Sequence, residues 1–149
     1  MANFRVVVLA SGTGTLFAAL ANQAEQIGIQ IVGLISEAEV PACERARELG
    51  IPVTVVPLLE DRIKWDQNLA TELSRLKPSL IVSAGFMKIL GPVVLRFHQG
   101  KIINTHPALL PDFPGAHAVR DALAAGVSQI SCESAVTSCP ASVRSFSCL

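Results

Sequence analysis

The stretch that decides the fold is FRVVVLASGTGTLFAALANQ, residues 4–23. Its first part, residues 4–10, is rich in β-branched residues and apolar except for Arg5, as is typical of a central parallel strand buried on both faces. Ser-Gly-Thr-Gly at 11–14 then forms a turn, and residues 15–26 carry apolar side chains at helical spacing. A strand, a glycine turn and a helix in this order predict the first half of a βαβ unit.

Strands and helices alternate along the rest of the chain. Further strands are predicted at 29–35, 52–56, 79–84 and 101–105, and helices at 40–49, 61–76, 92–97 and 117–125. This alternation implies right-handed crossovers and an α/β fold: a doubly wound, mostly parallel sheet with helices on both faces. Ligands of such sheets bind beyond the carboxyl ends of the strands. Three segments are expected there, residues 11–15, 85–90 and 104–115.

Composition narrows the class of protein. The 149 residues suffice for one domain, half of them are hydrophobic, 16% are charged, and the formal net charge is zero. This balance favours neither nucleic acid nor an anionic membrane surface as a partner.

Because no apolar run is long enough to span a bilayer and no signal-peptide pattern is present, we expect a cytoplasmic protein. Cys43 is expected to be a small buried hydrophobe, and the other cysteines match no zinc pattern.

The turn at Ser11–Thr15 is a candidate phosphate site. Free N–H groups and the dipole at a helix N-terminus attract anions, and glycines let a phosphate approach the backbone. A plain tight turn is the alternative. A dinucleotide fingerprint fails because its third glycine would fall at Phe17, and the lysine of a P-loop is absent. If the phosphate reading holds, bulk at Gly14 is expected to exclude the anion and to leave other ligands unaffected.

Asn104 and His106 end a predicted strand and project to the same side of an extended chain. An amide can stabilise a developing oxyanion, and an imidazole can move a proton near neutral pH, as acyl transfer requires. A satisfied polar pair at a strand end is the alternative. His98, near a helix end, is expected to be exposed, and His117 to cap or line the loop that follows Asn104–His106.

The apolar segment Gly85–Leu90 follows the predicted strand at 79–84. A flat heteroaromatic ligand could lie against its backbone at the ligand end of the sheet. Ordinary loop packing is the alternative.

Together these segments resemble glycinamide ribonucleotide formyltransferase. The resemblance runs from about Arg5 to Ser128 and is strongest at NTHPALLPDFPGAHAVRDAL, residues 104–123. This string is characteristic of folate-dependent formyltransferases and formyl-hydrolases, and the SGTGT loop favours the ribonucleotide enzymes among them. The resemblance implies a Rossmann-like formyltransferase fold. It also implies transfer of a formyl group from 10-formyltetrahydrofolate to the amine of glycinamide ribonucleotide in purine biosynthesis, with no metal. The subunits could form a homodimer.

The resemblance also implies roles for individual residues. Asn104 and His106 match the family's catalytic pair, and Asn104 also lies at the formyl-folate. The ribonucleotide phosphate would be held at Gly14, Thr15 and Leu16. The formyl-folate would be bound by Arg62 and by the backbone of Met87, Lys88, Ile89 and Leu90.

The composition of the sequence changes near residue 130. Counting from His106 places the family's catalytic Asp at about Ser142, in a Ser- and Cys-rich stretch without Asp. We therefore expect a formyltransferase domain at 1–129, a tail at 130–149 outside the family pattern, and a C-terminal part of the fold that is missing. A frameshift would produce this change, and a divergent tail is the alternative. The tail from Ser131 is expected to form no sheet strand, and catalysis to be impaired. A formyltetrahydrofolate hydrolase and a non-catalytic remnant of the fold stay open as alternatives.

Overall fold

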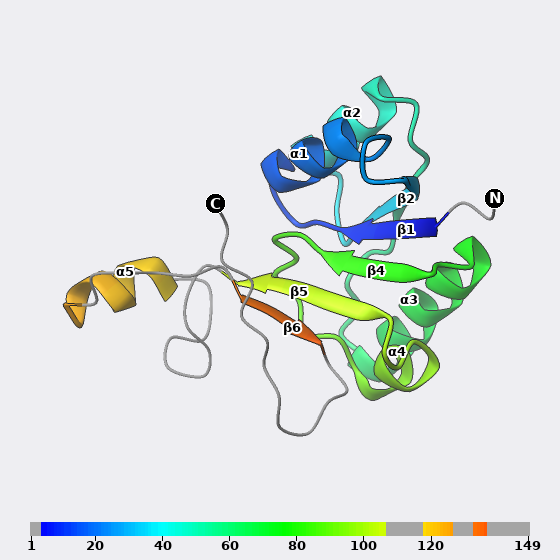
Figure 1. Ribbon diagram of the computed structural model, residues 1–149. Helices are drawn as coiled ribbons and strands as arrows, with labels where there is room; N and C mark the ends of the chain where they lie inside the picture. Colours follow the sequence, from blue (N-terminus) through cyan, green and yellow to red (C-terminus); the bar gives the residue numbers. More distant parts are fainter. Residues whose placement is uncertain (1–3, 107–117, 127–132, 137–149) are drawn as a thin grey trace.

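The computed structural model (Figure 1) describes residues 4–106, 118–126 and 133–136. The strands and helices predicted from the sequence pattern are confirmed, with small shifts at their ends. In chain order the elements are β1 (Phe4–Leu9), α1 (Thr15–Gln23), β2 (Ile29–Ser36), α2 (Pro41–Glu48), β3 (Val53–Val55), α3 (Arg62–Leu76), β4 (Leu80–Ser83), α4 (Pro92–Phe97), β5 (Ile102–His106), α5 (Ala118–Ala124) and β6 (Glu133–Val136).

All six strands belong to one sheet in the order β3-β2-β1-β4-β5-β6. The pairs β2–β3, β1–β2, β1–β4 and β4–β5 are parallel, and β6 runs antiparallel to β5. From β1 the chain first builds outward to β2 and β3, and then returns to the other side of β1 to form β4 and β5. The sheet is therefore doubly wound and mostly parallel, as predicted.

The strand β6 corrects one expectation. The chain after Ser131 was expected to form no sheet strand, yet Glu133–Val136 pairs with β5, with His106 opposite Glu133 and Ile103 opposite Val136. The outer edge of β5 offers a row of backbone N–H and C=O groups, and an extended segment can satisfy them without any special side-chain pattern. Sequence alternation was therefore a poor guide to pairing at this edge.

The core has two layers because β1 is apolar on both faces. Val7 and Leu9 pack with α3 and α4, whereas Val6 and Val8 pack with α1 and α2. Figure 1 shows the two helix pairs on opposite sides of the sheet. This arrangement explains why residues 6–10 form an uninterrupted apolar run rather than an alternating one. Cys43 of α2 is buried in the second layer, as predicted.

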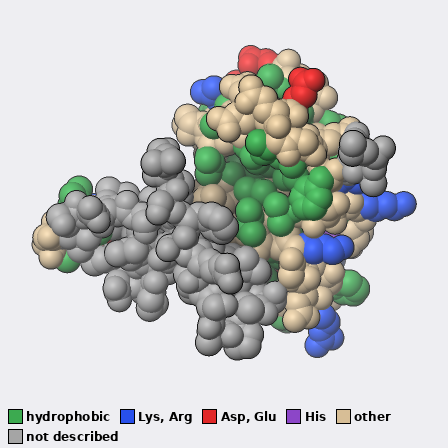
Figure 2. Space-filling view, viewed as in Figure 1, with side chains coloured by type: hydrophobic (Ala, Val, Ile, Leu, Met, Phe, Trp, Pro, Cys, Tyr) green, Lys and Arg blue, Asp and Glu red, His purple; other side chains and the backbone are tan. Residues whose placement is uncertain are grey.

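The face that carries α1 and α2 is covered unevenly. These helices connect β1 to β2 and β2 to β3, so they lie toward the β3 end of the sheet. In the described part of the chain no helix covers the same face of β4 and β5, and Leu80 and Ile103 are only partly buried there. Figure 2 shows hydrophobic side chains gathered on this face, below α1 and α2.

The longest helix, α3, forms where the pattern predicts it. Asp61 caps its N-terminus, since one carboxylate oxygen accepts from the N–H groups of Ile63 (3.0 Å) and Lys64 (3.1 Å). Trp65, Leu69 and Leu73 form its buried stripe. None of the helices in the described ranges is both long and apolar enough to cross a membrane.

Candidate functional site

The sheet has its topological switch point between β1 and β4, which are neighbours although their connections run in opposite directions. In doubly wound sheets the ligand site lies at this point, beyond the carboxyl ends of the strands. Two segments border it here: the β1 loop, residues 11–14, and the β4 loop, residues 85–91.

The β1 loop is shaped by close packing on α2. The N–H of Ala42 donates to the carbonyl of Gly12 (3.1 Å), and Nε of Arg45 donates to the carbonyl of Thr13 (2.8 Å). Gly14 has φ 74°, and a Cβ built on it would lie 2.7 Å from the Cβ of Ala42. Glycine is therefore required at position 14 both by the backbone conformation and by the space available.

The first turn of α1 can receive an anion. The helix begins at Thr15, its N-cap Gly14 supplies no side-chain cap, and its first turn holds no acidic residue. The first backbone N–H groups of a helix, here those of Thr15 and Leu16, have no partner within the helix. Together with the helix dipole they favour a negatively charged group.

This packing contradicts the expectation that bulk at Gly14 would affect only binding of the anion. A side chain there would meet Ala42 before it met any ligand, so bulk would disturb the loop itself. An effect confined to the anion is therefore not expected from Gly14→Val. Gly12 is the better position for a probe, because a Cβ there has no atom within 4 Å.

The β4 loop is held by side chains from other parts of the chain. Its Met87 N–H donates to Oγ of Ser11 (2.9 Å), and Nη2 of Arg62 donates to the carbonyl of Ile89 (2.9 Å). The side chains of Met87 and Ile89 remain exposed, at 63% and 84%. A fixed backbone beside exposed apolar side chains is a surface against which a flat, partly apolar ligand can lie.

Arg62 is itself held by an aromatic pair. Its guanidinium carbon lies 4.4 Å from the centroid of Trp65, and Trp65 stacks on Phe86 at 6.4 Å between ring centroids. The indole N–H of Trp65 donates to the carbonyl of Val56 (3.0 Å), which fixes the ring. The structure thus brings Arg62 to the segment Met87–Leu90, as the sequence resemblance implied.

Asp66 fixes the far end of the β4 loop and was missed by sequence reasoning. Its side chain, 2% exposed, accepts from the N–H groups of Gly91 (3.0 Å), Val93 (2.7 Å) and Val94 (3.4 Å), and so caps α4. A Cβ on Gly91 would lie 2.3 Å from Oδ2 of Asp66, so only glycine fits there. In the sequence Asp66 looks like one more polar residue of α3, because its partners lie well beyond that helix.

Asn104 and His106 lie on β5, the next strand beyond β4. Asn104 is partly buried and stands opposite Ser83, while the hydroxyl of Thr105 donates to the carbonyl of Ser83 (3.2 Å). Parallel pairing places the end of β5 at the same edge as the β1 and β4 loops. The predicted loop at 107–117, with His117, lies outside the described residues.

Glu37 is a second residue that sequence reasoning missed. It follows β2 directly, and its carboxylate accepts from Oγ of Ser11 (2.9 Å) and lies 3.7 Å from Nζ of Lys88. Its position right after a strand, at the carboxyl edge of the sheet, was a signal that could have identified it.

His98 was expected to be exposed, and this expectation is wrong. The residue is 5% exposed and lies between α4 and α3, with Nε2 3.5 Å from Oγ of Ser74. Burial lowers the pKa of His98, a hydrogen bond with the backbone of Ala70 opposes that shift, and the charge of Lys101 adds to it. The neighbouring Gln and Gly suggested a surface turn, but the ring of His98 packs back onto α3.

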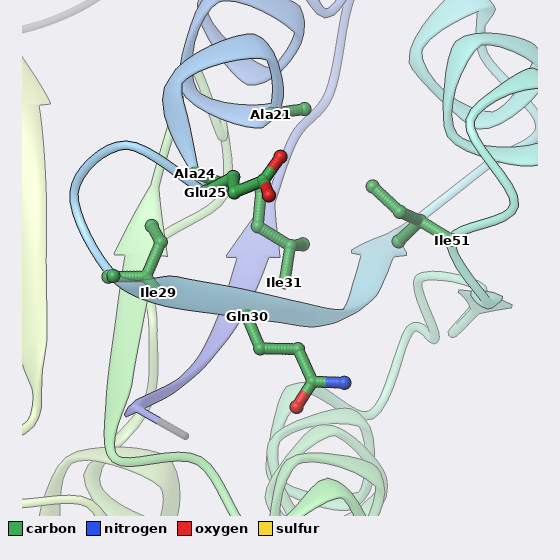
Figure 3. Close-up of a pocket in the computed structure, with 8 residues that line it drawn as sticks. Ala21, Ala24, Glu25, Ile29, Gln30, Ile31 and Ile51 are labelled. Atoms are coloured by element: carbon green, nitrogen blue, oxygen red, sulfur yellow. The ribbon is translucent and has the colours of Figure 1, made fainter. Parts of the chain in front are cut away.

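A shallow pocket of about 490 Å³ lies at the opposite end of the sheet (Figure 3). Ala21 and Ala24 from the end of α1, Ile29 and Ile31 from the start of β2, and Ile51 line it together with Glu25, Gly28 and Gln30. Amino-terminal strand ends are not where doubly wound sheets bind ligands, so we do not assign the site there. Among the described residues, no group of three or more His, Cys, Asp or Glu side chains could hold a metal ion.

Comparison with known proteins agrees with this layout. The chain is 46% identical over 126 residues to the phosphoribosylglycinamide formyltransferase of Mycobacterium tuberculosis, covering 83% of this chain and 59% of that protein. The crystal structure of the phosphoribosylglycinamide formyltransferase from Streptococcus pneumoniae matches with TM-score 0.79 and 34% identity, over 87% of this chain and 71% of that one. Glycinamide ribonucleotide transformylase 1 from Symbiobacterium toebii matches with TM-score 0.85 and 31% identity, over 95% and 68%.

The chain thus spans 59% of the length of the M. tuberculosis protein that it matches. A family model described as formyl transferase matches residues 4–135, which include both loops of the switch point and all of β5. With the sheet order, the two loops and these similarities in agreement, the chain belongs to the formyl transferase family.

Proposed function

We propose that the chain transfers a formyl group from 10-formyltetrahydrofolate to the amine of glycinamide ribonucleotide, a step of purine biosynthesis. One observation carries this proposal: the segments that the resemblance assigns to the two ligands meet at the switch point. The β1 loop reaches the β4 loop through Ser11 and Met87 (2.9 Å), and Arg62 reaches Ile89 (2.9 Å). The formyl donor and the acceptor amine would therefore lie side by side.

The reaction would use the chain's own residues in the following roles. The ribonucleotide phosphate binds at Gly14, Thr15 and Leu16, and the folate binds along Met87–Leu90 with Arg62. The amine attacks the formyl carbon and forms a tetrahedral oxyanion. Asn104 donates a hydrogen bond to that oxyanion. His106 moves the proton that the amine loses toward the departing folate nitrogen, which leaves formylated product and tetrahydrofolate.

The tail bears on the expected rate of catalysis. The domain was expected at residues 1–129, but the family model matches up to residue 135 and β6 pairs with β5, so we propose that the tail outside the family pattern begins after about residue 135. Ser142, where the family's catalytic Asp is expected, lies outside the described residues. Without that Asp the imidazolium of His106 is less favoured. By analogy with catalytic triads that lack their carboxylate, we expect turnover lower by on the order of a thousandfold or more.

A turnover assay tests both parts of the proposal. The purified chain is incubated with 10-formyltetrahydrofolate, with and without glycinamide ribonucleotide, and tetrahydrofolate and formylated product are followed. We expect slow product formation that requires the nucleotide and is abolished by His106→Ala. Folate release that is independent of the nucleotide and yields formate would favour the hydrolase instead. Binding of both ligands without turnover would indicate the non-catalytic remnant, and binding of neither would refute the proposal.

Cytoplasmic location and assembly as a homodimer belong to the same proposal. The proposed substrates are small, highly polar metabolites of the cell interior, and no metal is required for this chemistry. Fractionation of cells and sedimentation of the purified chain would check location and assembly.

A further inference from the structure

Glu37 contacts both loops of the switch point although it belongs to neither. It follows Ser36 at the end of β2, and its side chain is 11% exposed. Oε2 accepts a hydrogen bond from Oγ of Ser11 at 2.9 Å, and Oε1 lies 3.7 Å from Nζ of Lys88. One carboxylate therefore connects the start of the β1 loop with the middle of the β4 loop.

In the hydrogen bond between Ser11 and Glu37, the donor and the acceptor are fixed. A serine hydroxyl has one hydrogen to donate and lone pairs to accept with. Ser11 donates that hydrogen to Glu37 and accepts from the backbone N–H of Met87 at 2.9 Å. A carboxylate accepts only, so it fixes the direction of the hydroxyl and presents the lone pair of Ser11 to Met87.

The second connection restrains Lys88. Its side chain is 32% exposed and pairs with the carboxylate at the end of β2. Its neighbours Met87 and Ile89, in contrast, are exposed. The pair also balances the charge of a carboxylate that is hydrogen-bonded to Ser11, in the loop that leads to the proposed phosphate site.

We propose that Glu37 is a positioning residue that sets the β4 loop relative to the β1 loop, so that the two ligand segments are aligned. This inference rests on the proposed function for the identity of the ligands, but not for the alignment itself. The physical claim is that removing the carboxylate frees the Ser11 hydroxyl, weakens its bond to Met87 and releases Lys88.

Amide hydrogen exchange followed by NMR on the ligand-free, full-length chain tests the alignment. Glu37→Ala is expected to speed exchange of the Met87 amide about threefold to tenfold, the equivalent of one net hydrogen bond. Exchange in both loops should rise, and exchange in β1 and β4 should stay unchanged. Glu39→Ala is the matched control, because Glu39 is exposed and pairs with Arg47 on the surface. The control should leave both loops unaffected.

A double-mutant cycle separates positioning from mere space filling. Ser11→Ala removes the acceptor of the Met87 N–H itself, so Ser11→Ala combined with Glu37→Ala should speed Met87 exchange no more than Ser11→Ala alone. Glu37→Gln should restore much of the protection, because its amide oxygen can still accept from Ser11. Additive effects of the two alanine changes, or unchanged exchange at Met87 in Glu37→Ala, would overturn the inference.

Ligand binding distinguishes failure of this inference from failure of the proposed function. Calorimetry measures glycinamide ribonucleotide with and without a saturating, unreactive formyl-folate analogue, in the wild type and in Glu37→Ala. We expect each ligand to strengthen binding of the other in the wild type and this mutual effect to shrink in the variant. If neither ligand binds but the exchange cycle behaves as expected, the proposed function fails and the alignment stands. If both bind and Met87 exchange is unchanged, only the role of Glu37 fails.

Discussion

The β1 loop is held mainly by close backbone packing against α2, with one side-chain hydrogen bond from Arg45, whereas the β4 loop is held by side chains from several other parts of the chain. In the first, Gly14 touches Ala42 and adopts φ 74°. In the second, Ser11, Arg62 and Asp66 each hold one point of the backbone. A loop built by packing tolerates little change, while a loop held by separate hydrogen bonds can lose one and keep its course.

This difference suits the two proposed ligands. A phosphate is recognised by backbone N–H groups at a fixed helix N-terminus, which a rigid glycine loop provides. A folate is larger and offers several contact points, so individual hydrogen bonds along the β4 loop can be adjusted. The comparison predicts large effects on the fold for changes in the β1 loop and graded effects on one ligand for changes around the β4 loop.

The largest effect is expected from Gly14→Val. The backbone conformation and the contact with Ala42 should together cost about 2–5 kcal/mol of folding free energy. Chemical denaturation measures this loss, and Gly12→Ala is the control, because a Cβ at Gly12 has no atom within 4 Å. A stable Gly14→Val protein that loses only nucleotide binding would contradict the claim that packing in the β1 loop is needed for the fold.

Asp66→Ala should give the next largest effect. It leaves the N–H groups of Gly91 and Val93 without their carboxylate, at a cost of about 1–3 kcal/mol. Because these residues end the β4 loop, folate binding should weaken while the fold survives. Asp61→Ala removes the exposed cap of α3 and serves as control, with a smaller cost and no loss of folate affinity. Equal folate losses in both variants would mean that α3 stability, not the β4 loop, decides binding.

A smaller and more selective effect is expected from Arg62→Met. The change removes the hydrogen bond to Ile89 and the cation over Trp65, and keeps a long apolar side chain. Loss of a hydrogen bond of about 1 kcal/mol corresponds to roughly fivefold weaker binding of the folate analogue. Calorimetry should show unchanged nucleotide affinity. A loss of nucleotide binding would show that the two loops are not independent at this position.

The smallest effect concerns pH and His98, which braces α4 behind the β4 loop. Its pKa is lowered in the folded state, chiefly by burial, so the unfolded chain takes up a proton first as the pH falls below about 6.5. The stability that His98 contributes is complete above that pH and declines as the pH falls toward the folded pKa. Thermal unfolding should show a lower stability at pH 5.0 than at pH 7.5, and His98→Gln should abolish the part of this loss that comes from His98. An identical pH dependence in the variant would exclude His98 as the cause.

Features with a local pattern could be predicted from the sequence. The apolar run at 6–10, the turn at Gly12 and Gly14, and the cap at Asp61 each express their structure within a few residues. The alternation of elements then predicted which loops share an edge and placed Met87 and Asn104 at the ligand end of the sheet, whereas Arg62 was assigned to the folate only through the family resemblance. Short-range patterns and one topological rule were sufficient for these features.

Features that depend on distant partners could not be predicted. Asp66 and His98 reveal their roles only through α4 and α3, which pack against each other from separate parts of the chain. Glu37 depends on contacts with loops that follow two other strands. β6 depends on an open strand edge rather than on its own composition. In each case the structure depends on an interaction between residues that are far apart in the sequence, and helix or strand periodicity does not reveal such a pair.

The central claim is that the β1 and β4 loops hold two different ligands at the switch point. Backbone amide shifts of the labelled chain, recorded during separate titrations with glycinamide ribonucleotide and with an unreactive formyl-folate analogue, test it most directly. We expect the nucleotide to move the amides of Thr15 and Leu16 most, and the folate analogue to move those of Met87–Leu90. Shifts centred instead on Ala21, Ile29 and Ile51 at the opposite end of the sheet, or no shifts at either loop, would contradict the claim.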